Sequence, residues 1–302
     1  MLGMRMMTAI GVALMLATAS GCLAARTPAW ITHVSTAIPV TPAAQANAEL
    51  VAQGETEWGQ RVDEAHALAA VAAWTEALDR APHDAVLWAR LARAQYFLAD
   101  AHVSADPARA SEAAQLYADA ITSGERSLLA RLPALGSLLR TGQPFAEILG
   151  TLDERDVPGL YWRTLALSRW SRGNGMFVQQ SVRDELRRSM ARVAELDRSY
   201  DGAGPDRFLG DAWATASTTQ GGDLERAAIH FEVAMREAPD HFANHVLFAM
   251  DVATKTQDRA LFERTLHHVV AADPGGADIA AENVAEQRRA QAALARVAQL
   301  FP

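Results

Sequence analysis

The chain has few of the features that usually point to an activity. Cys22 is its only cysteine in 302 residues, so no disulfide can form within one chain. The net charge is −8, which argues against nucleic acid as a partner. No G-x-S-x-G nucleophile elbow is present. We therefore expect neither enzymatic activity nor a cofactor.

Strand patterns are also missing, and long runs of β-branched residues are sparse. Alanine, leucine, arginine and glutamate dominate instead, and this composition favours helix throughout. Two glycine-rich stretches, 171–175 and 219–223, do not follow a strand, so they do not suggest a phosphate site. They are typical of turns between helices, with Asp223 as an N-cap. The predicted fold class is all-α.

The N-terminus resembles a secretion signal. Arg5 precedes an apolar run at 6–19, which is shorter than the roughly 20 residues that a membrane-spanning helix needs. Small residues then lead directly to Cys22, as in the lipobox of bacterial lipoproteins. We predict a lipoprotein signal peptide at 1–21 and lipidation of Cys22. The alternative is an ordinary signal peptide with a chance cysteine.

Several acyl chains on one cysteine would hold the protein stably at a membrane. Leu23 follows the cysteine, where Asp would favour retention at the inner membrane. We therefore expect a periplasmic location, anchored in the inner leaflet of the outer membrane. Residues 22–50 contain prolines and lack helical periodicity, which predicts a lipidated tether.

Two segments match the second helix of a tetratricopeptide (TPR) repeat, in which small residues and one aromatic allow close helix packing before a proline. The full matches are Ala70, Trp74, Ala77 and Pro82, and then Ala227, Phe231, Ala234 and Pro239. A partial match is Ala113, Tyr117 and Ala120. We predict an irregular TPR-like solenoid of helical hairpins over 51–302. The alternative is a generic helical bundle with small-residue seams.

Long segments at 101–111 and 124–158 interrupt the repeats. Helix connections usually span about 2–8 residues, so this extra chain must pack on the body. If it crossed the concave face, the apolar side chains of 124–158 would wall a mostly apolar pocket. The candidate pocket residues are Tyr161, Trp162, Trp170 and Asn174.

Histidines offer the only hint of a metal site. His241 and His245 are four residues apart on an expected helix, a spacing that can share a metal ion. No zinc-protease glutamate follows His241, and no cysteine is available. We predict solvent-facing or hydrogen-bonded histidines and no metal.

From residue 156 onward the chain resembles a known family. The stretches that carry the resemblance are "DVPGLYWRTLALSRWSRGNG" (156–175), "GGDLERAAIHFEVAM" (221–235), "TQDRALFERTLHHVVAADP" (256–274) and "ENVAEQRRAQAALARVAQLF" (282–301). They are similar to the TatT component of tripartite ATP-independent periplasmic (TRAP) transporters. Members of that family have a lipobox and a TPR-like helical body.

The resemblance implies a non-catalytic lipoprotein that binds a TRAP solute-binding protein and passes a small hydrophobic ligand through a cavity. It leaves open whether the protein forms a homo-oligomer. Some matching positions can be determinants of the fold: Tyr161, Trp162, Gln257, Asp258, Arg259, Asn283, Gln287 and Arg288. The alternative function is a general TPR scaffold for protein–protein interaction in the cell envelope.

Overall fold

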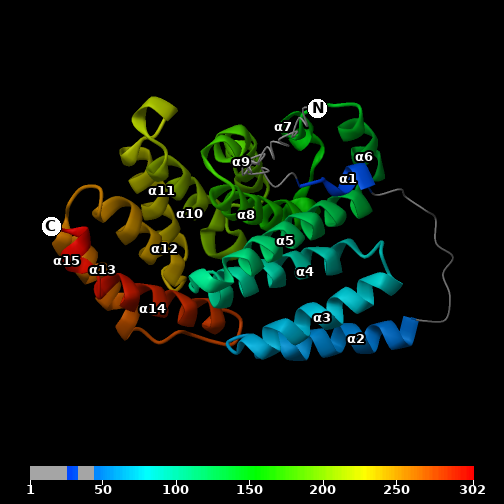
Figure 1. Ribbon diagram of the computed structural model, residues 1–302, viewed down its shortest axis with the longest axis horizontal. Coiled ribbons are helices and arrows are strands. Elements are labelled where there is room, and N and C mark those ends of the chain that lie inside the picture. The colour runs from blue at the N-terminus through cyan, green and yellow to red at the C-terminus, as the bar shows by residue number, and fades with distance from the viewer. Residues whose placement is uncertain (1–25, 33–43) are drawn as a thin grey trace, which may run out of the picture.

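The computed structural model describes residues 26–32 and 44–302 (Figure 1). Throughout these ranges the regular structure is helical, with no strand, which confirms the all-α prediction. Every helix in them is too short or too polar to span a lipid bilayer. The predicted signal peptide (1–21) and Cys22 lie outside the described residues.

The helices follow one another in hairpins and pack mainly on their neighbours in the chain (Figure 1). They are α1 (Ala29–Thr32), α2 (Ala44–Trp58), α3 (Glu64–Arg80), α4 (Ala85–Phe97), α5 (Ala110–Arg131), α6 (Pro133–Arg140), α7 (Phe145–Ile148), α8 (Val157–Gly173), α9 (Met176–Leu196), α10 (Tyr200–Thr215), α11 (Leu224–Glu237), α12 (Phe242–Phe248), α13 (Arg259–Ala271), α14 (Ala280–Leu294) and α15 (Val297–Leu300). Two π-helical turns, η1 (Leu98–Val103) and η6 (Ala249–Ala253), extend α4 and α12.

Aspartates begin several of these helices. The side chains of Asp63, Asp84 and Asp258 accept hydrogen bonds from backbone N–H groups in the first turns of α3, α4 and α13. Asp223 does the same for α11, which confirms it as an N-cap. Each carboxylate satisfies a donor that the helix itself leaves unpaired.

The two full repeat matches mark buried seams. Trp74 in α3 is 1% exposed and Phe231 in α11 is fully buried. Each ring lies against a glycine of the preceding helix. A Cβ on Gly54 would lie 2.2 Å from the Trp74 indole, and one on Gly210 would lie 2.9 Å from the Phe231 ring. The glycines therefore set how closely these helices approach.

Residues 124–158 do not wall the pocket, so that expectation is wrong. Most of their large apolar side chains are buried in a core with α1, α8 and α9: Leu128, Leu129, Leu135, Leu139 and Phe145. Because α6 packs beside α5 and α7 packs beside α9 at this core, the apolar groups are covered there. No residue of 124–158 lines the cavity described below.

The other long segment, 101–111, lies at the cavity. Ala101 and Ser104 contribute to its wall, and the preceding η1 turn contacts α14. Two parts of the range predicted as a tether, 22–50, belong to the folded body: residues 44–50 begin helix α2, and residues 26–32 pack on α5 and α6. Ala29 is buried there.

Candidate functional site

A cavity of about 610 Å³ lies among helices that are far apart in the chain. Its walls come mainly from α4, α8, α10, α12 and α14, together with η1 and η6, and single residues of α5 and α15 complete them. This volume is within the range typical of small-molecule sites. The apolar part of the lining includes Trp162, Leu165, Phe208, Val246, Leu247, Met250 and Leu300.

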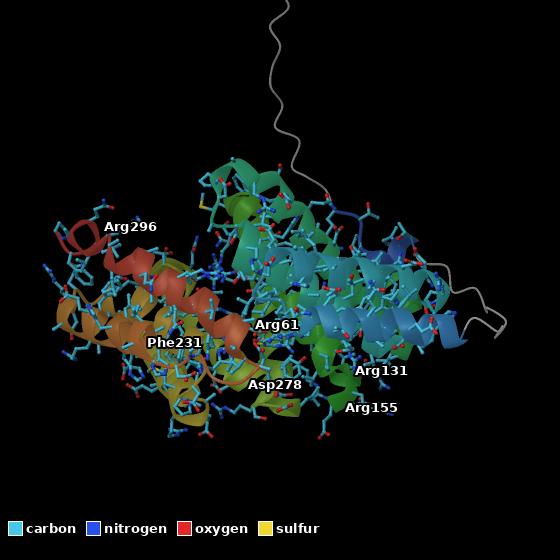
Figure 2. All side chains as sticks on the ribbon, turned by 90° about the horizontal axis from the view of Figure 1, so that it is seen from below. Arg61, Arg131, Arg155, Phe231, Asp278 and Arg296 are labelled. Atoms are coloured by element: carbon cyan, nitrogen blue, oxygen red, sulfur yellow. The ribbon has the colours of Figure 1, made fainter. Side chains whose placement is uncertain are left out.

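Ion pairs close the cavity between its N-terminal and C-terminal walls. Glu282 of α14 accepts hydrogen bonds from Arg61 Nη2 at 2.6 Å and from Arg93 Nη2 at 2.8 Å. Arg61 also donates to the carbonyl of Asp278 at 2.8 Å, and these two residues lie side by side in Figure 2. These contacts join segments that are about 190–220 residues apart in sequence.

Apolar packing does not bridge this closure. Within the described residues, the hydrophobic clusters of the C-terminal wall draw on residues 213–301, whereas the clusters around α2–α5 draw on residues 29–212. Arg289 of α14 pairs instead with Asp100 of η1. The contacts between α14 and the N-terminal wall are therefore made mainly by charged groups, whereas α10 packs closely on α11 elsewhere.

The cavity lining contains many more charges than the sequence suggested. Its arginines are Arg93, Arg169, Arg172, Arg207, Arg289 and Arg296, and its carboxylates are Asp100, Asp201, Asp211, Glu282 and Glu286. Most of them pair with one another. A ligand in this space would therefore contact polar groups as well as the apolar wall.

Asp100 is the centre of one charged cluster. Its carboxylate contacts Arg169 Nε at 3.1 Å and accepts a hydrogen bond from the Tyr117 hydroxyl at 3.2 Å. Burial alone would raise the pKa of Asp100. Arg169 and Arg289 outweigh burial and hold the pKa at about 2. Asp100 is therefore a fixed anion at neutral pH.

A second network is centred on Asp201 in the cavity wall. The Tyr161 hydroxyl donates to Asp201 Oδ2 at 2.7 Å, and Arg207 Nη2 contacts the same oxygen at 2.6 Å. Arg207 Nη1 donates to Asn244 Oδ1 at 2.9 Å. Burial, with the nearby Arg207, lowers the pKa of His241 to about 3. His241 is thus a neutral member of this network.

The backbone at this network is left-handed. Asp201, Gly202 and Ala203 have φ values of 52°, 62° and 58°. Such a conformation is unfavourable for residues with a side chain, so it requires support from its surroundings. Arg207 donates to the carbonyls of Asp201 and Gly202, both at 3.2 Å. This strained turn fixes the direction in which α10 enters the cavity wall.

Another carboxylate, Asp251 of η6, lies beside the cavity. Burial, and then the nearby charge of Asp211, raise the pKa of Asp251 to about 7. Arg172, Lys255 and Arg169 oppose this rise only in part. Arg172 forms its ion pair with Asp211. Asp251 and Asp100 therefore have opposite pKa shifts within one region.

Of the pocket residues proposed from the sequence, the structure brings two together. Trp162 lines the cavity, and its indole donates to the Tyr200 hydroxyl at 3.1 Å. Tyr161 is fully buried behind it, with ring centroids 4.9 Å apart. Trp170 packs into the core, and Asn174 ends α8 and donates to the carbonyl of Trp170 at 2.8 Å. Neither of these two is among the lining residues.

Helical spacing could have revealed the missing residues on α8. Leu165, Arg169 and Arg172 follow Trp162 by three, seven and ten positions, so all four share one face. Trp170 is eight positions from Trp162 and lies on the neighbouring side. An aromatic side chain is typical of an apolar pocket wall, whereas an arginine is not, so residue type alone does not indicate Arg169 and Arg172.

The two histidines do different things. His241 belongs to the Arg207 network, whereas the ring of His245 contacts the carbonyl of Pro239 at 2.8 Å. The described part of the chain has no group of three or more His, Cys, Asp or Glu residues that could hold a metal ion.

Asn283 and Gln287 of α14 stabilise the fold. Asn283 Nδ2 donates to the carbonyls of Asp240 and Pro274, at 2.8 and 3.0 Å. Gln287 donates to two carbonyls at the end of α13, at 2.8 and 3.1 Å. These contacts agree with the interpretation of the two positions as determinants of the fold.

The fold and cavity define a class of helical proteins that hold a small-molecule-sized cavity between their hairpins. Comparison with family models is more specific. The model of the family described as "TRAP transporter T-component" matches residues 92–301. The chain belongs to this family. No curated protein matches the chain.

Proposed function

We propose that this protein is a lipid-anchored, periplasmic accessory component of a TRAP transport system. In this role it binds the solute-binding subunit and holds a small ligand without transforming it. Membership in the T-component family supports the link to TRAP transport. The cavity of about 610 Å³ is the observation that carries the ligand-binding part.

We further propose that the helical hairpins form an irregular TPR-like solenoid. Two hairpins support this by the same device, an aromatic ring seated on a glycine of the preceding helix. The pairs are Trp74 with Gly54 and Phe231 with Gly210. In each case the second helix ends two residues before a proline, Pro82 or Pro239.

The anchor of this proposal is Cys22, with 1–21 as the lipoprotein signal peptide and the inner leaflet of the outer membrane as the destination. Metabolic labelling with a palmitate analogue tests it. The wild type should be labelled and Cys22→Ala should not, because the diacylglycerol is attached through that thiol. Labelling of the variant would contradict the anchor.

The ligand of the cavity is a small molecule with an apolar body and a polar group. The apolar wall, formed in part by Leu165, Phe208 and Leu247, favours the first property. A fully apolar ligand would cover paired arginines without offering them a hydrogen bond, which costs free energy. This argument favours a ligand whose polar group faces the charged part of the lining.

Native mass spectrometry of protein purified gently from its own cells tests the proposal. The expected spectrum contains a small bound molecule and a complex with a TRAP solute-binding protein. The variant Leu247→Arg places a long charged side chain in the apolar wall and should lose the small molecule. The control Leu68→Arg changes a leucine that is 45% exposed and lies outside the lining, and should retain it.

Binding of unrelated envelope proteins, with neither the small molecule nor the solute-binding protein present, would contradict this proposal. That result would favour the general TPR scaffold instead.

A further inference from the structure

The N-terminal segment just after the proposed anchor is firmly attached to the body. Arg26 Nη1 donates to Glu125 Oε2 at 3.0 Å, and the Glu125 side chain is fully buried. The backbone N–H of Ala29 donates to the same carboxylate at 2.7 Å. Trp30 stacks on Phe145 with ring centroids 5.9 Å apart and planes inclined by 15°.

This attachment limits how far the body can lie from an anchor. Cys22 precedes Arg26 by four residues, which span at most about 14 Å even when fully extended. A lipid on Cys22 would therefore keep the surface around Arg26 close to the bilayer. A tether of nearly thirty residues would have left the orientation of the body free.

The surface at this point is formed by α1 and α6, which pack against each other (Figure 1). We define the α1–α6 face as residues 26–32 and 133–144. Ile31 of α1 is 54% exposed and Leu138 of α6 is 40% exposed. Arg140, also exposed, donates to the carbonyl of Trp30 at 3.1 Å and so ties α6 to α1.

The charge of this face differs from that of the whole chain. The net charge is −8, yet residues 1–48 contain no Asp or Glu, and neither do residues 126–146. Of the three arginines in the latter stretch, Arg140 alone lies on the α1–α6 face, whereas Arg131 pairs with Asp153 and Asp156. Glu125 is buried in its pair with Arg26, so it contributes no exposed negative charge. A face with exposed apolar groups, arginine and no acidic residue is compatible with an anionic lipid surface.

We infer that the α1–α6 face lies on the phospholipid surface that holds the anchor, with Ile31 and Leu138 directed into the headgroup region. This inference rests on the proposed lipidation of Cys22. It fixes the orientation of the protein, because the cavity lining includes no residue of α1 or α6. The cavity and the closure at α14 are thus left uncovered by the membrane.

Single labelled cysteines test the orientation in the mature, full-length lipoprotein. Cys22 is the only cysteine and its sulfur carries the lipid, so an introduced cysteine is the only free thiol. The test variants are Ile31→Cys and Leu138→Cys. The control is Ile229→Cys, since Ile229 in α11 is also 54% exposed but lies far from residues 26–32 in sequence and packing.

Each variant is labelled with an environment-sensitive fluorophore and reconstituted in vesicles of phosphatidylethanolamine and phosphatidylglycerol that contain nitroxide lipid. The labels at positions 31 and 138 should shift to the blue and lose emission to the nitroxide. The label at position 229 should keep both its wavelength and its intensity.

Equal quenching at all three positions, or none at positions 31 and 138, would overturn the inference. So would self-quenching of these two labels in detergent, which indicates a second copy on the face. A blue shift of the labels at positions 31 and 138 that occurs only after solute-binding protein is added would also overturn it, because a protein would then cover the face. The intact mass of the same samples separates the two proposals. If the protein is acylated but the labels at positions 31 and 138 show no shift or quenching, membrane contact of the α1–α6 face is refuted and the lipidation of Cys22 stands. If the protein carries no acyl chains, lipidation of Cys22 is refuted, and this inference with it.

Discussion

The repeat seams and the closure of the cavity hold helices together in different ways. The seams at Trp74 and Phe231 are dry contacts between an aromatic ring, alanines and a glycine, formed by helices adjacent in the chain. The closure joins α14 to α4 and to the turn between α2 and α3, through Glu282, Arg93 and Arg61, and no apolar cluster of the described residues links α14 to these segments. The hairpins are thus stable locally, whereas the cavity depends on electrostatic contacts over long sequence distances.

The largest expected effect is at the seams. Trp74→Ala and Phe231→Ala each remove a buried ring, so the free energy of unfolding should fall by about 3–5 kcal/mol. Denaturant unfolding monitored by circular dichroism measures this. The control Val86→Ala changes a side chain that is 64% exposed and should be within about 0.5 kcal/mol of the wild type. If the free energy of unfolding of these two variants fell as little as that of the control, the rings would not contribute to the packing of the helices.

A smaller loss is expected at the closure. Glu282→Gln leaves the guanidinium of Arg61, which is 3% exposed, without its carboxylate. The free energy of unfolding should fall by about 1.5–3 kcal/mol. Glu76→Gln is the matched control, because Glu76 pairs with Arg80 on an exposed helix face and contributes about 0.5 kcal/mol or less. Equal losses in the two variants would refute a special role for the closure.

The contributions of Asp251 and Asp100 to stability should depend on pH with opposite signs. The pKa of Asp251 is raised to about 7 in the folded state. The folded protein therefore binds this proton more tightly than the unfolded chain, which stabilises it fully at pH values below the ordinary pKa of an aspartate. This contribution is lost as pH rises toward 7. Asp251→Asn should therefore raise the free energy of unfolding at pH 8, by about 1–4 kcal/mol, and the melting temperature with it. No gain is expected near pH 4. A gain that is independent of pH would contradict this assignment.

Asp100 gives the opposite sign. Its pKa is lowered to about 2, so it stabilises the protein above its ordinary pKa and loses that contribution as pH falls toward 2. Asp100→Asn should therefore destabilise the protein at pH 7 and matter progressively less below pH 4. Melting temperatures measured across this range test the sign directly. An unchanged difference between pH 7 and pH 3 would contradict it.

Although they missed α1 and the start of α2, local patterns were sufficient to predict the helical class, the seam residues and the N-cap at Asp223. These depend on spacing along one or two adjacent helices, because burial follows helical periodicity and capping involves only the next three residues. Helical spacing also places Trp162, Arg169 and Arg172 on one face of α8, the face that lines the cavity. The predicted lining residue Trp170 lies on the neighbouring side of this helix.

What the sequence by itself determined is therefore the helical class, the hairpin seams and a resemblance concentrated after residue 156. Only the tertiary structure decided that α14 returns to α4, that Glu282 meets Arg61 and Arg93, and that residues 124–158 lie away from the cavity. The physical reason is that an arginine on a helix surface has the same local pattern whether it faces water or a distant carboxylate. The stacking of the hairpins determines which carboxylate the arginine meets, and the spacing of nearby residues does not predict that stacking.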